Sequence, residues 1–331
     1  MTNDKNFIVI TTIFNPTDSV LKIAQRENTH LIVVGDKKTP KDWQIENSKA
    51  QITFLSSDDK KGYNIEKVLP YNHYCRKMLG YIYAKNQGAQ FIYETDDDNY
   101  PKENWHVPNF EDEILVVQKN EVKFSNVYRY YSDEHIWPRG FPLELITNEK
   151  TQPNNTTKEK VKIGVFQGLV DNEPDFDAIY RLTVNKPVYF NDKEPIALSE
   201  GLYCPYNSQN TFTVKELFPL LYLPCTVTFR FTDILRGLIA QPIMNLYDYK
   251  LAFSTSTAIQ ERNVHDFMKD FDSEIPVYQN VAKVIELTEN AIKKEDSLSD
   301  NLHNVYAKLL ENDIVKKEEI EILEAWLNDI C

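Results

Sequence analysis

Runs of apolar residues recur at regular intervals through the first hundred residues. Residues 7–13 (FIVITTI) and 31–35 (LIVVG) are nearly unbroken runs rich in β-branched residues, a pattern typical of strands buried on both faces of a parallel sheet. Residues 52–55 and 91–95 (FIYET) predict two further strands. The first third of the chain therefore predicts a sheet with several buried strands.

Helical patterns separate these strands. Residues 18–27 have helical spacing, and a longer helix is predicted from Asn72, a good N-cap, to Gly88, which suits the C′ position. Alternating strands and helices indicate a doubly wound sheet with right-handed crossovers. We therefore expect an α/β fold with a mixed, mostly parallel sheet and flanking helices.

The pattern changes near residue 277. From there to residue 331, stretches rich in Lys and Glu carry apolar residues at i, i+3 and i+4, as amphipathic helices do. We predict one domain over residues 1–276 and a helical C-terminal appendage over residues 277–331. The apolar stripes predict that this appendage packs on the core or pairs with a partner, which includes a second copy of the chain.

Composition narrows the classes of function. The formal net charge of −13 argues against nucleic-acid binding, and nine glycines among 331 residues disfavour glycine-rich nucleotide loops. The four cysteines lie far apart without a CxxC pair, which predicts reduced thiols and a cytoplasmic location. We expect neither a targeting segment nor a membrane span, because no apolar stretch is long enough.

The sharpest chemical signal is ETDDDN at residues 94–99, where three aspartates directly follow an apolar strand. Ligands of open α/β sheets bind at the carboxyl ends of the strands. Adjacent carboxylates repel each other, and a hard divalent cation bound through oxygen holds them together. Such a cation can bridge them to a diphosphate and neutralise charge as a phosphate leaves. The alternative is an acidic turn on a solvated surface.

Several motifs occur in the order found in known glycosyltransferases. A strand that ends in an aspartate cluster resembles the DxD motif of the GT-A glycosyltransferases. Residues 85–99, 137–143 (WPRGFPL) and 223–241 are similar to the STELLO-type glycosyltransferases. The aspartate cluster, the RG-aromatic-P segment and GLVDNEPDFDA at residues 168–178 more distantly resemble the reversibly glycosylated polypeptides, the UDP-arabinopyranose mutase family. The matches end near residue 278, so we expect the C-terminal helices to lie outside the resemblance.

The resemblance implies a GT-A-like, metal-dependent glycosyltransferase. It would move a sugar from a nucleoside-diphosphate sugar, with a UDP-sugar as the expected donor, to a hydroxyl acceptor, with a glycan as the expected class. Mn²⁺ or Mg²⁺ is the implied cofactor. Two alternatives stay open: a nucleotide-sugar mutase or self-glycosylating protein, and a non-catalytic scaffold that retains the fold.

The resemblance also implies roles for residues of the donor and metal sites. Asp96 and Asp98 match the outer positions of the DxD-like motif, one for the donor ribose and one for the metal, and Asp97 could share either role. His265 is a candidate for the late histidine that completes the metal shell in many GT-A enzymes, the alternative being an ordinary surface residue. The residues expected near the donor are Thr11, Thr12, Asp36, Arg76 and Lys77. For the two cations, the alternative is a solvated helix face.

A second group of candidates would act on the sugar or the acceptor. Arg139 in WPRGFPL aligns with the segment that carries a glycosylated arginine in the mutase family, and an Arg in a stiff aromatic loop suits a sugar or a phosphate; the alternative is a structural turn. Asp233 matches an acidic position of the family and is a candidate general base or sugar ligand, or else a helix N-cap. Asp175, Asp177 and Arg236 are candidates for sugar or acceptor binding. Turn and capping roles are the alternative for Asp175 and Asp177.

Overall fold

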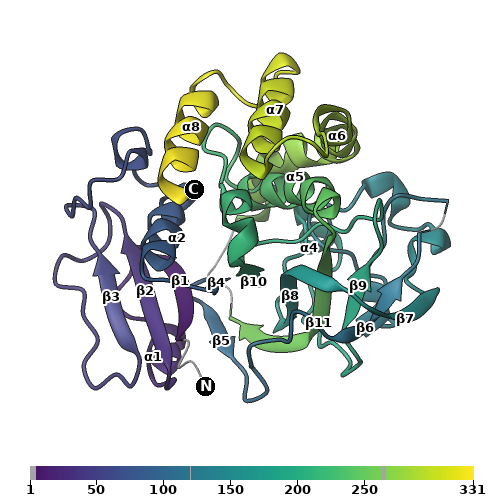
Figure 1. The fold of residues 1–331 in the computed structure, drawn as a ribbon. Helices are drawn as coiled ribbons and strands as arrows, with labels where there is room; N and C mark the ends of the chain where they lie inside the picture. Colours follow the sequence, from purple (N-terminus) through teal and green to yellow (C-terminus); the bar gives the residue numbers. More distant parts are fainter. Residues whose placement is uncertain (1–4, 120, 262–265) are drawn as a thin grey trace.

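The computed structural model describes residues 5–119, 121–261 and 266–331. Its strands are β1 (Asn6–Thr12), β2 (Thr29–Gly35), β3 (Gln51–Leu55), β4 (Phe91–Thr95), β5 (Asn99–Pro101), β6 (Glu113–Val117), β7 (Thr156–Lys160), β8 (Lys162–Asn172), β9 (Ile196–Leu198), β10 (Asn210–Val214) and β11 (Tyr249–Gln260). They form one sheet in the order β3-β2-β1-β4-β10-β8-β11-β9-β6-β7, with β5 paired to β11 (Figure 1).

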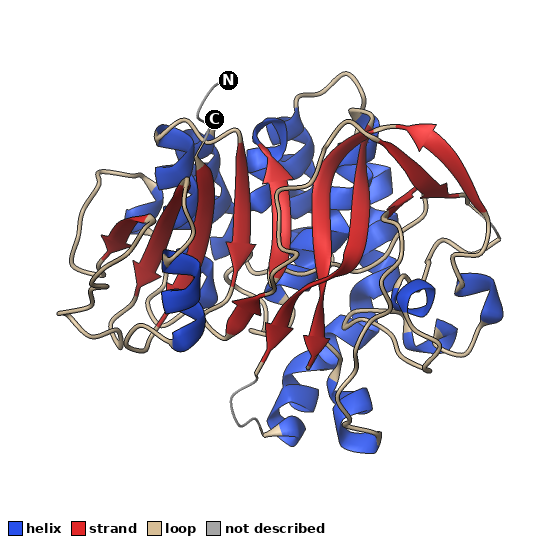
Figure 2. Cartoon of the chain, turned by 90° about the horizontal axis from the view of Figure 1, so that it is seen from below, coloured by secondary structure: helices blue, strands red, loops and turns tan. Residues whose placement is uncertain are grey.

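The helices flank this sheet. They are α1 (Asp18–Ala24), α2 (Lys77–Asn86), α3 (Tyr128–Tyr131), α4 (Ala178–Thr183), α5 (Thr232–Leu246), α6 (Phe267–Ala291), α7 (Leu298–Glu311) and α8 (Glu318–Ile330). Short 3₁₀ helices are η1 (Ile65–Lys67), η2 (Tyr74–Arg76), η3 (Leu143–Leu145), η4 (Glu149–Thr151) and η5 (Lys215–Leu221). In Figure 2 most of the helices lie behind the strands.

The sheet combines a parallel part with a mixed part. β3, β2, β1 and β4 are parallel neighbours, and they are the four strands that the apolar runs predict. β10 is antiparallel to β4 and β8, whereas β11 is parallel to β8 and antiparallel to β9. The predicted α/β class, with a mixed sheet and flanking helices, is confirmed.

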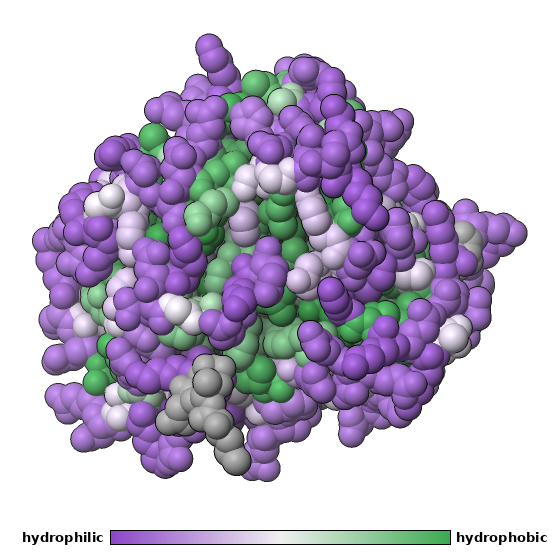
Figure 3. Space-filling view, viewed as in Figure 1, coloured by the Kyte–Doolittle hydropathy of each residue, from purple (hydrophilic) through white to green (hydrophobic). Residues whose placement is uncertain are grey.

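Both faces of the parallel part are covered, which explains its continuous apolar runs. Successive side chains of a strand point to opposite faces. Phe7 and Val9 of β1 belong to a core shared with α2 and the C-terminal helices, whereas Ile8 and Ile10 pack in a second core with residues of α1. On the molecular face seen in Figure 3, apolar residues show through the centre and hydrophilic residues surround them.

The C-terminal helices share the main core. Tyr306 of α7 and Trp326 of α8 are buried in the same cluster as residues of α2 and α5. Glu319 of α8 is fully buried, and its carboxylate accepts hydrogen bonds from the backbone N–H groups of Cys225 and Thr226. The apolar stripes of these helices are therefore covered within the chain. Residue 277, the predicted start of the appendage, lies inside α6, and the two-domain division stays a prediction.

Candidate functional site

A cavity of about 360 Å³ opens where the parallel strands end. That size is in the range of small-molecule sites, roughly 300–1,000 Å³. The loops after β1, β2 and β4 line one part of it, and segments around α5 line another. The predicted site residues that line it are Thr11, Thr12, Asp36, Arg76, Asp96, Asp97, Asp98, Arg139, Asp175 and Asp233. Residues far apart in the sequence thus meet at one cavity.

The three consecutive aspartates are each oriented by protein donors. Oδ1 of Asp96 accepts a hydrogen bond from Nζ of Lys77 at 3.0 Å, and Oδ2 of Asp98 accepts one from Nε2 of Gln260 at 3.0 Å. Oδ2 of Asp97 accepts one from the hydroxyl of Thr12. Burial raises the pKa of Asp97, although the hydrogen bond from Thr12 opposes the shift. The turn is therefore a structured part of the cavity wall and not a loose acidic surface.

This donor set fits a hard divalent cation. In the described part of the chain, Oδ2 of Asp96 has no hydrogen-bond partner, while Oδ1 of Asp96 and Oδ2 of Asp97 are held by protein donors. Carboxylates held in this way by outer donors are typical of metal ligands. No group of three His, Cys, Asp or Glu side chains suited to a metal occurs among the residues that the structure describes. Mg²⁺ commonly binds through one or two carboxylates and completes its shell with water and substrate phosphates. His265 lies outside the described residues.

Arg76 and Lys77 are buried, so the alternative of a solvated helix face is wrong. Lys77 is fully buried and its Nζ donates to the carbonyl of Thr95 at 2.7 Å as well as to Asp96. It lies behind the aspartate turn and does not line the cavity. Arg76 does line the cavity, with its Nε 3.8 Å from Oδ1 of Asp36. Arg76 is thus placed to meet a ligand, whereas Lys77 supports Asp96 from within.

A chain of hydroxyl groups connects Asp96 to Asp233. The hydroxyl of Tyr74 donates to Oδ1 of Asp96 at 2.9 Å and lies 2.6 Å from Oγ of Ser208. Oγ of Ser208 lies 3.3 Å from Oδ2 of Asp233. Burial, followed by the charge of Asp96, raises the pKa of Tyr74 well above its ordinary value, so this phenol stays protonated. The carboxylates of Asp96 and Asp233, which both line the cavity, therefore share one hydrogen-bond network.

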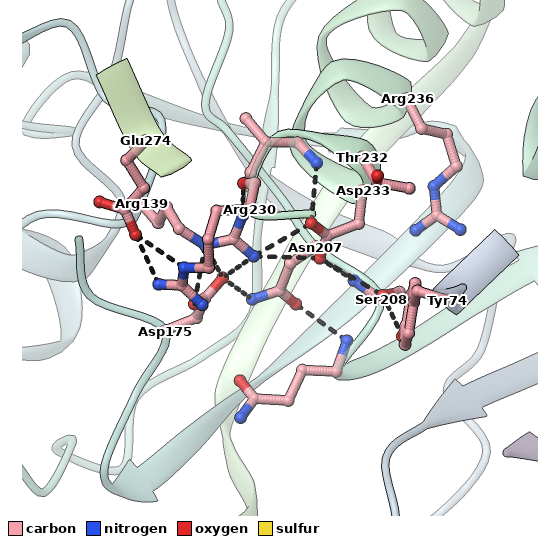
Figure 4. A network of polar contacts seen from close by, with 12 residues as sticks. Tyr74, Arg139, Asp175, Asn207, Ser208, Arg230, Thr232, Asp233, Arg236 and Glu274 are labelled. Atoms are coloured by element: carbon pink, nitrogen blue, oxygen red, sulfur yellow. Dashed lines mark hydrogen bonds and ion pairs between the residues drawn. The ribbon is translucent and has the colours of Figure 1, made fainter. Parts of the chain in front are cut away.

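Arg139 is the centre of a buried network of ion pairs, shown in Figure 4. Its Nε donates to Oδ1 of Asp175 at 2.9 Å, its Nη2 donates to Oδ1 of Asp233 at 3.0 Å, and its Nη1 donates to the carbonyl of Arg230. Arg230 in turn donates through Nε to Glu274 of α6 at 2.8 Å. Burial alone would lower the pKa of Arg139, but the charges of Asp175 and Asp233 outweigh burial and raise this pKa well above its ordinary value.

The loop that carries Arg139 is fixed by its backbone as well. The backbone N–H of Arg139 donates to the carbonyl of Asp175 at 2.9 Å. The next residue, Gly140, has φ = 84°, and a Cβ there would lie 2.5 Å from a methyl group of Ile234. A side chain at position 140 would therefore clash as well as strain the backbone. The loop positions Arg139 between two carboxylates of other segments.

The structure bears on the helix-capping alternatives for Asp233 and Asp177. Asp233 is the second residue of α5, whose N-cap is Phe231, so the N-cap alternative is wrong. Asp177 does not line the cavity: it caps α4 by accepting from the backbone N–H of Tyr180 and also binds Nε1 of Trp137 at 2.7 Å. Burial raises the pKa of Asp177 to about 6.

Arg236 also lies away from the cavity. It is buried on α5 and forms two hydrogen bonds with Glu94 of β4, at 2.9 Å and 2.7 Å. The hydroxyl of Tyr81 donates to the same carboxylate. The predicted sugar-binding role of Arg236 is therefore not supported by its position.

Sequence reasoning missed several residues at the site. Tyr74, Ser208, Asn207 and Arg230 belong to the networks around Asp96, Asp175 and Asp233. The polar run NSQN at residues 207–210, directly before an alternating strand pattern, is a signal that could have indicated Asn207 and Ser208. Glu274 lies in an ordinary helical pattern, and nothing local distinguishes it.

Across the described ranges, no helix combines the length and the apolar character needed to cross a bilayer.

Fold and site together define an α/β protein with a carboxylate-lined cavity at the ends of its parallel strands. The family model for STELLO glycosyltransferases matches residues 230–331. Two proteins of Arabidopsis thaliana, named "Probable glycosyltransferase STELLO1" and "Probable glycosyltransferase STELLO2", are each 25% identical to the chain over 98% of its length. The match covers 44% of each of these relatives, so the chain spans less than half of their length. The predicted resemblance to the STELLO-type glycosyltransferases is confirmed.

The same comparison corrects the expected extent of the resemblance. The matched residues 230–331 include α6, α7 and α8, so the expectation that the C-terminal helices lie outside the resemblance is wrong. Their burial against the core agrees with this result.

Among solved structures, a glucosyl-3-phosphoglycerate synthase from Mycobacterium tuberculosis is 12% identical to the chain. The alignment covers 89% of this chain and 82% of that one, with a TM-score of 0.41. That score is too low to assign a shared fold or function.

Proposed function

We propose that the protein is a glycosyltransferase that moves a sugar from a nucleoside-diphosphate sugar, with UDP as the nucleotide, to a hydroxyl group of a glycan. The observation that carries this proposal is the single cavity that joins the aspartate turn after β4 to the buried carboxylate of Asp233. One end suits a diphosphate and its cation, and the other suits an attacking hydroxyl. The relation to the STELLO glycosyltransferases supports the same reaction class.

The donor would lie along the ends of the parallel strands. Thr12 and Asp36 lie where β1 and β2 end, and the guanidinium of Arg76 lies beside Asp36. Arginine suits a phosphate because its planar fork donates two hydrogen bonds. Asp96 and Asp98 would hold Mn²⁺ or Mg²⁺. When bound, this cation neutralises charge that develops on the departing diphosphate.

Asp233 is the proposed general base. Its carboxylate lines the cavity, and hydrogen bonds from Arg139 and Ser208 fix its orientation. In the reaction a carboxylate oxygen of Asp233 would take the proton of the acceptor hydroxyl. The hydroxyl oxygen would bond to the anomeric carbon as the bond from that carbon to the diphosphate breaks and UDP leaves. Positioned carboxylates act in this way in many enzymes.

The geometry gives less support to the mutase or self-glycosylation alternative. That reaction would use Arg139 as the nucleophile, but all three guanidinium nitrogens of Arg139 donate to protein oxygens. A sugar on any of them would break part of a buried ion-pair network. The cytoplasmic location predicted from the sequence stays a prediction.

Calorimetry with UDP, in the presence and absence of Mn²⁺, tests the proposal. We expect UDP to bind more tightly with Mn²⁺, and a donor screen to detect released UDP with at least one UDP-sugar. UDP binding that is absent under both conditions would overturn the proposal and favour a scaffold. Intact-mass analysis after incubation with UDP-sugars separates the alternatives, because only self-glycosylation adds the mass of a sugar to the chain.

A further inference from the structure

An aromatic side chain stands exposed at the cavity. Phe229 contributes to the cavity lining, yet 60% of its surface is exposed. Its neighbours Arg230 and Phe231 are 6% and 1% exposed. A large apolar side chain that remains open to solvent beside a ligand cavity suggests a surface that a ligand covers.

The exposure of Phe229 is imposed by the segment that carries it. Oγ1 of Thr228 donates to the carbonyl of Ser273 at 2.6 Å, and the backbone N–H of Arg230 donates to Oγ of Ser273 at 3.4 Å. A turn closes between these two contacts, with the N–H of Phe231 donating to the carbonyl of Thr228 at 2.9 Å. Because the residues on both sides are anchored on α6, the backbone of Phe229 is held in place at the cavity.

Phe229 also contacts a residue that links the aspartate turn to Asp233. Its ring meets the ring of Tyr74 edge to face, with centroids 5.9 Å apart. Tyr74 donates to Asp96 and contacts Ser208, which contacts Asp233. The exposed ring therefore stands beside the network that connects the diphosphate end to the proposed base.

The cavity offers an apolar ring next to polar groups, and this combination matches one class of ligand. A pyranose has an apolar face of C–H groups and an edge of hydroxyls. An aromatic ring covers such a face, while carboxylate and guanidinium groups bind the hydroxyls. Around Phe229 the polar partners are Asp175, Asp233 and Arg230, which line the same cavity.

We propose that Phe229 is the acceptor platform, and that the acceptor is a saccharide whose pyranose ring stacks on Phe229 with one hydroxyl directed to Asp233. This inference rests on the proposed function and assigns its acceptor class and one specificity-determining residue. The donor nucleotide is assigned elsewhere, to the ends of β1 and β2, so Phe229 acts on acceptor binding and not on UDP binding.

The test measures saccharide binding by ligand-observed NMR on the full chain, with UDP and Mn²⁺ present. The probes are the methyl glycosides of glucose, galactose, mannose and arabinose, each as a pyranose in both anomeric forms, together with cellobiose and maltose. We expect at least one probe to bind and Phe229→Ala to weaken that binding about tenfold, the loss of roughly one aromatic contact. Phe229→Trp should keep binding within about threefold, because the platform persists.

Tyr189→Ala is the matched control, because Tyr189 is 65% exposed but does not line the cavity. We expect it to leave saccharide binding unchanged, and both alanine variants to keep the UDP affinity and melting temperature of the parent chain. Saccharide binding that is equal in Phe229→Ala and the parent, or absent in the parent, would overturn the inference while UDP binding still supports the transferase. If the parent chain does not bind UDP, that result would instead contradict the proposed function itself.

Discussion

Two groups of buried charges in this protein differ in what surrounds them. Glu94 and Arg236 form a pair in which one carboxylate meets one guanidinium, both are at most 2% exposed, and neither lines the cavity. Arg139 instead lies between two carboxylates, Asp175 and Asp233, and all three line the cavity. The first group is enclosed by the core, whereas the second lies next to space for a ligand.

This difference distinguishes a structural role from a chemical one. In the pair enclosed by the core, both terminal nitrogens of Arg236 bind Glu94, so removing one partner mainly costs stability. The second network extends through Arg230 to Glu274, and its carboxylates Asp175 and Asp233 border the cavity. Titratable groups that line a cavity are candidates for catalysis. Buried charge alone therefore does not identify a functional site. Whether the charged residues line the cavity distinguishes the candidate site from the structural pair.

The largest expected effect is on the closed pair. Arg236→Met leaves the carboxylate of Glu94 buried without its cation, which should lower the free energy of unfolding by about 3–5 kcal/mol. Urea unfolding followed by circular dichroism measures this loss. The double variant Glu94→Leu with Arg236→Met removes both charges and should recover most of the stability. A single variant as stable as the parent chain would show that the pair is not structural.

The next effect is expected at Asp177, a buried carboxylate that does not line the cavity. The pKa of Asp177 is raised from 3.8 to about 6, chiefly by burial, so the folded state holds the proton more tightly than the unfolded state. The free energy of unfolding should therefore fall as the pH rises from about 4 to about 6, by about 3 kcal/mol. Asp177→Asn still caps α4 and should remove this pH-dependent term. Unfolding curves measured between pH 4 and pH 7 should diverge for the two proteins; parallel pH dependences would contradict the assignment.

The parts of the fold that follow from local pattern were predictable from the sequence. β1 and β2 are unbroken apolar runs because both faces of each strand are covered, and the aspartate turn follows β4 directly. The burial of Lys77 was not predictable, since a charged residue at the start of a helix has the same pattern in solvent. Its partners Thr95 and Asp96 come from another segment, so its burial depends on tertiary packing.

The networks of the site depend on packing in the same way. Glu274 on α6 meets Arg230 across 44 residues of sequence, and Ser208 meets Asp233 across 25. An acidic residue next to a helix start predicts an N-cap, but α5 begins one residue before Asp233, and this shift turns the carboxylate into a partner of Arg139. A difference of two residues in the helix boundary thus separates the capping interpretation from the proposed catalytic one.

Asp233→Asn tests the network in which Arg139 lies between Asp175 and Asp233. The amide keeps the shape and accepts a hydrogen bond from Arg139, but it cannot take the proton of the acceptor hydroxyl. We expect turnover to fall about 100-fold, with UDP affinity unchanged, as for the loss of a general base. The matched control is Asp177→Asn, the same change at a closed carboxylate, which should leave turnover unchanged. Normal turnover in Asp233→Asn would show that Asp233 and its network have a structural role and not a catalytic one.

The smallest effect is expected at the aspartate turn, and it separates donor binding from catalysis. Asp98 lines the cavity and accepts a hydrogen bond from the amide of Gln260. Asp98→Asn keeps the size of the side chain and removes the charge that would attract a cation, so UDP affinity in Mn²⁺ should fall about tenfold, or roughly 1.4 kcal/mol. Calorimetry in Mn²⁺ and in EDTA measures the change, and UDP affinity in EDTA should stay the same because it does not depend on the cation. An equal loss in both buffers would assign Asp98 to direct nucleotide contact, and no loss in either would remove it from the donor site.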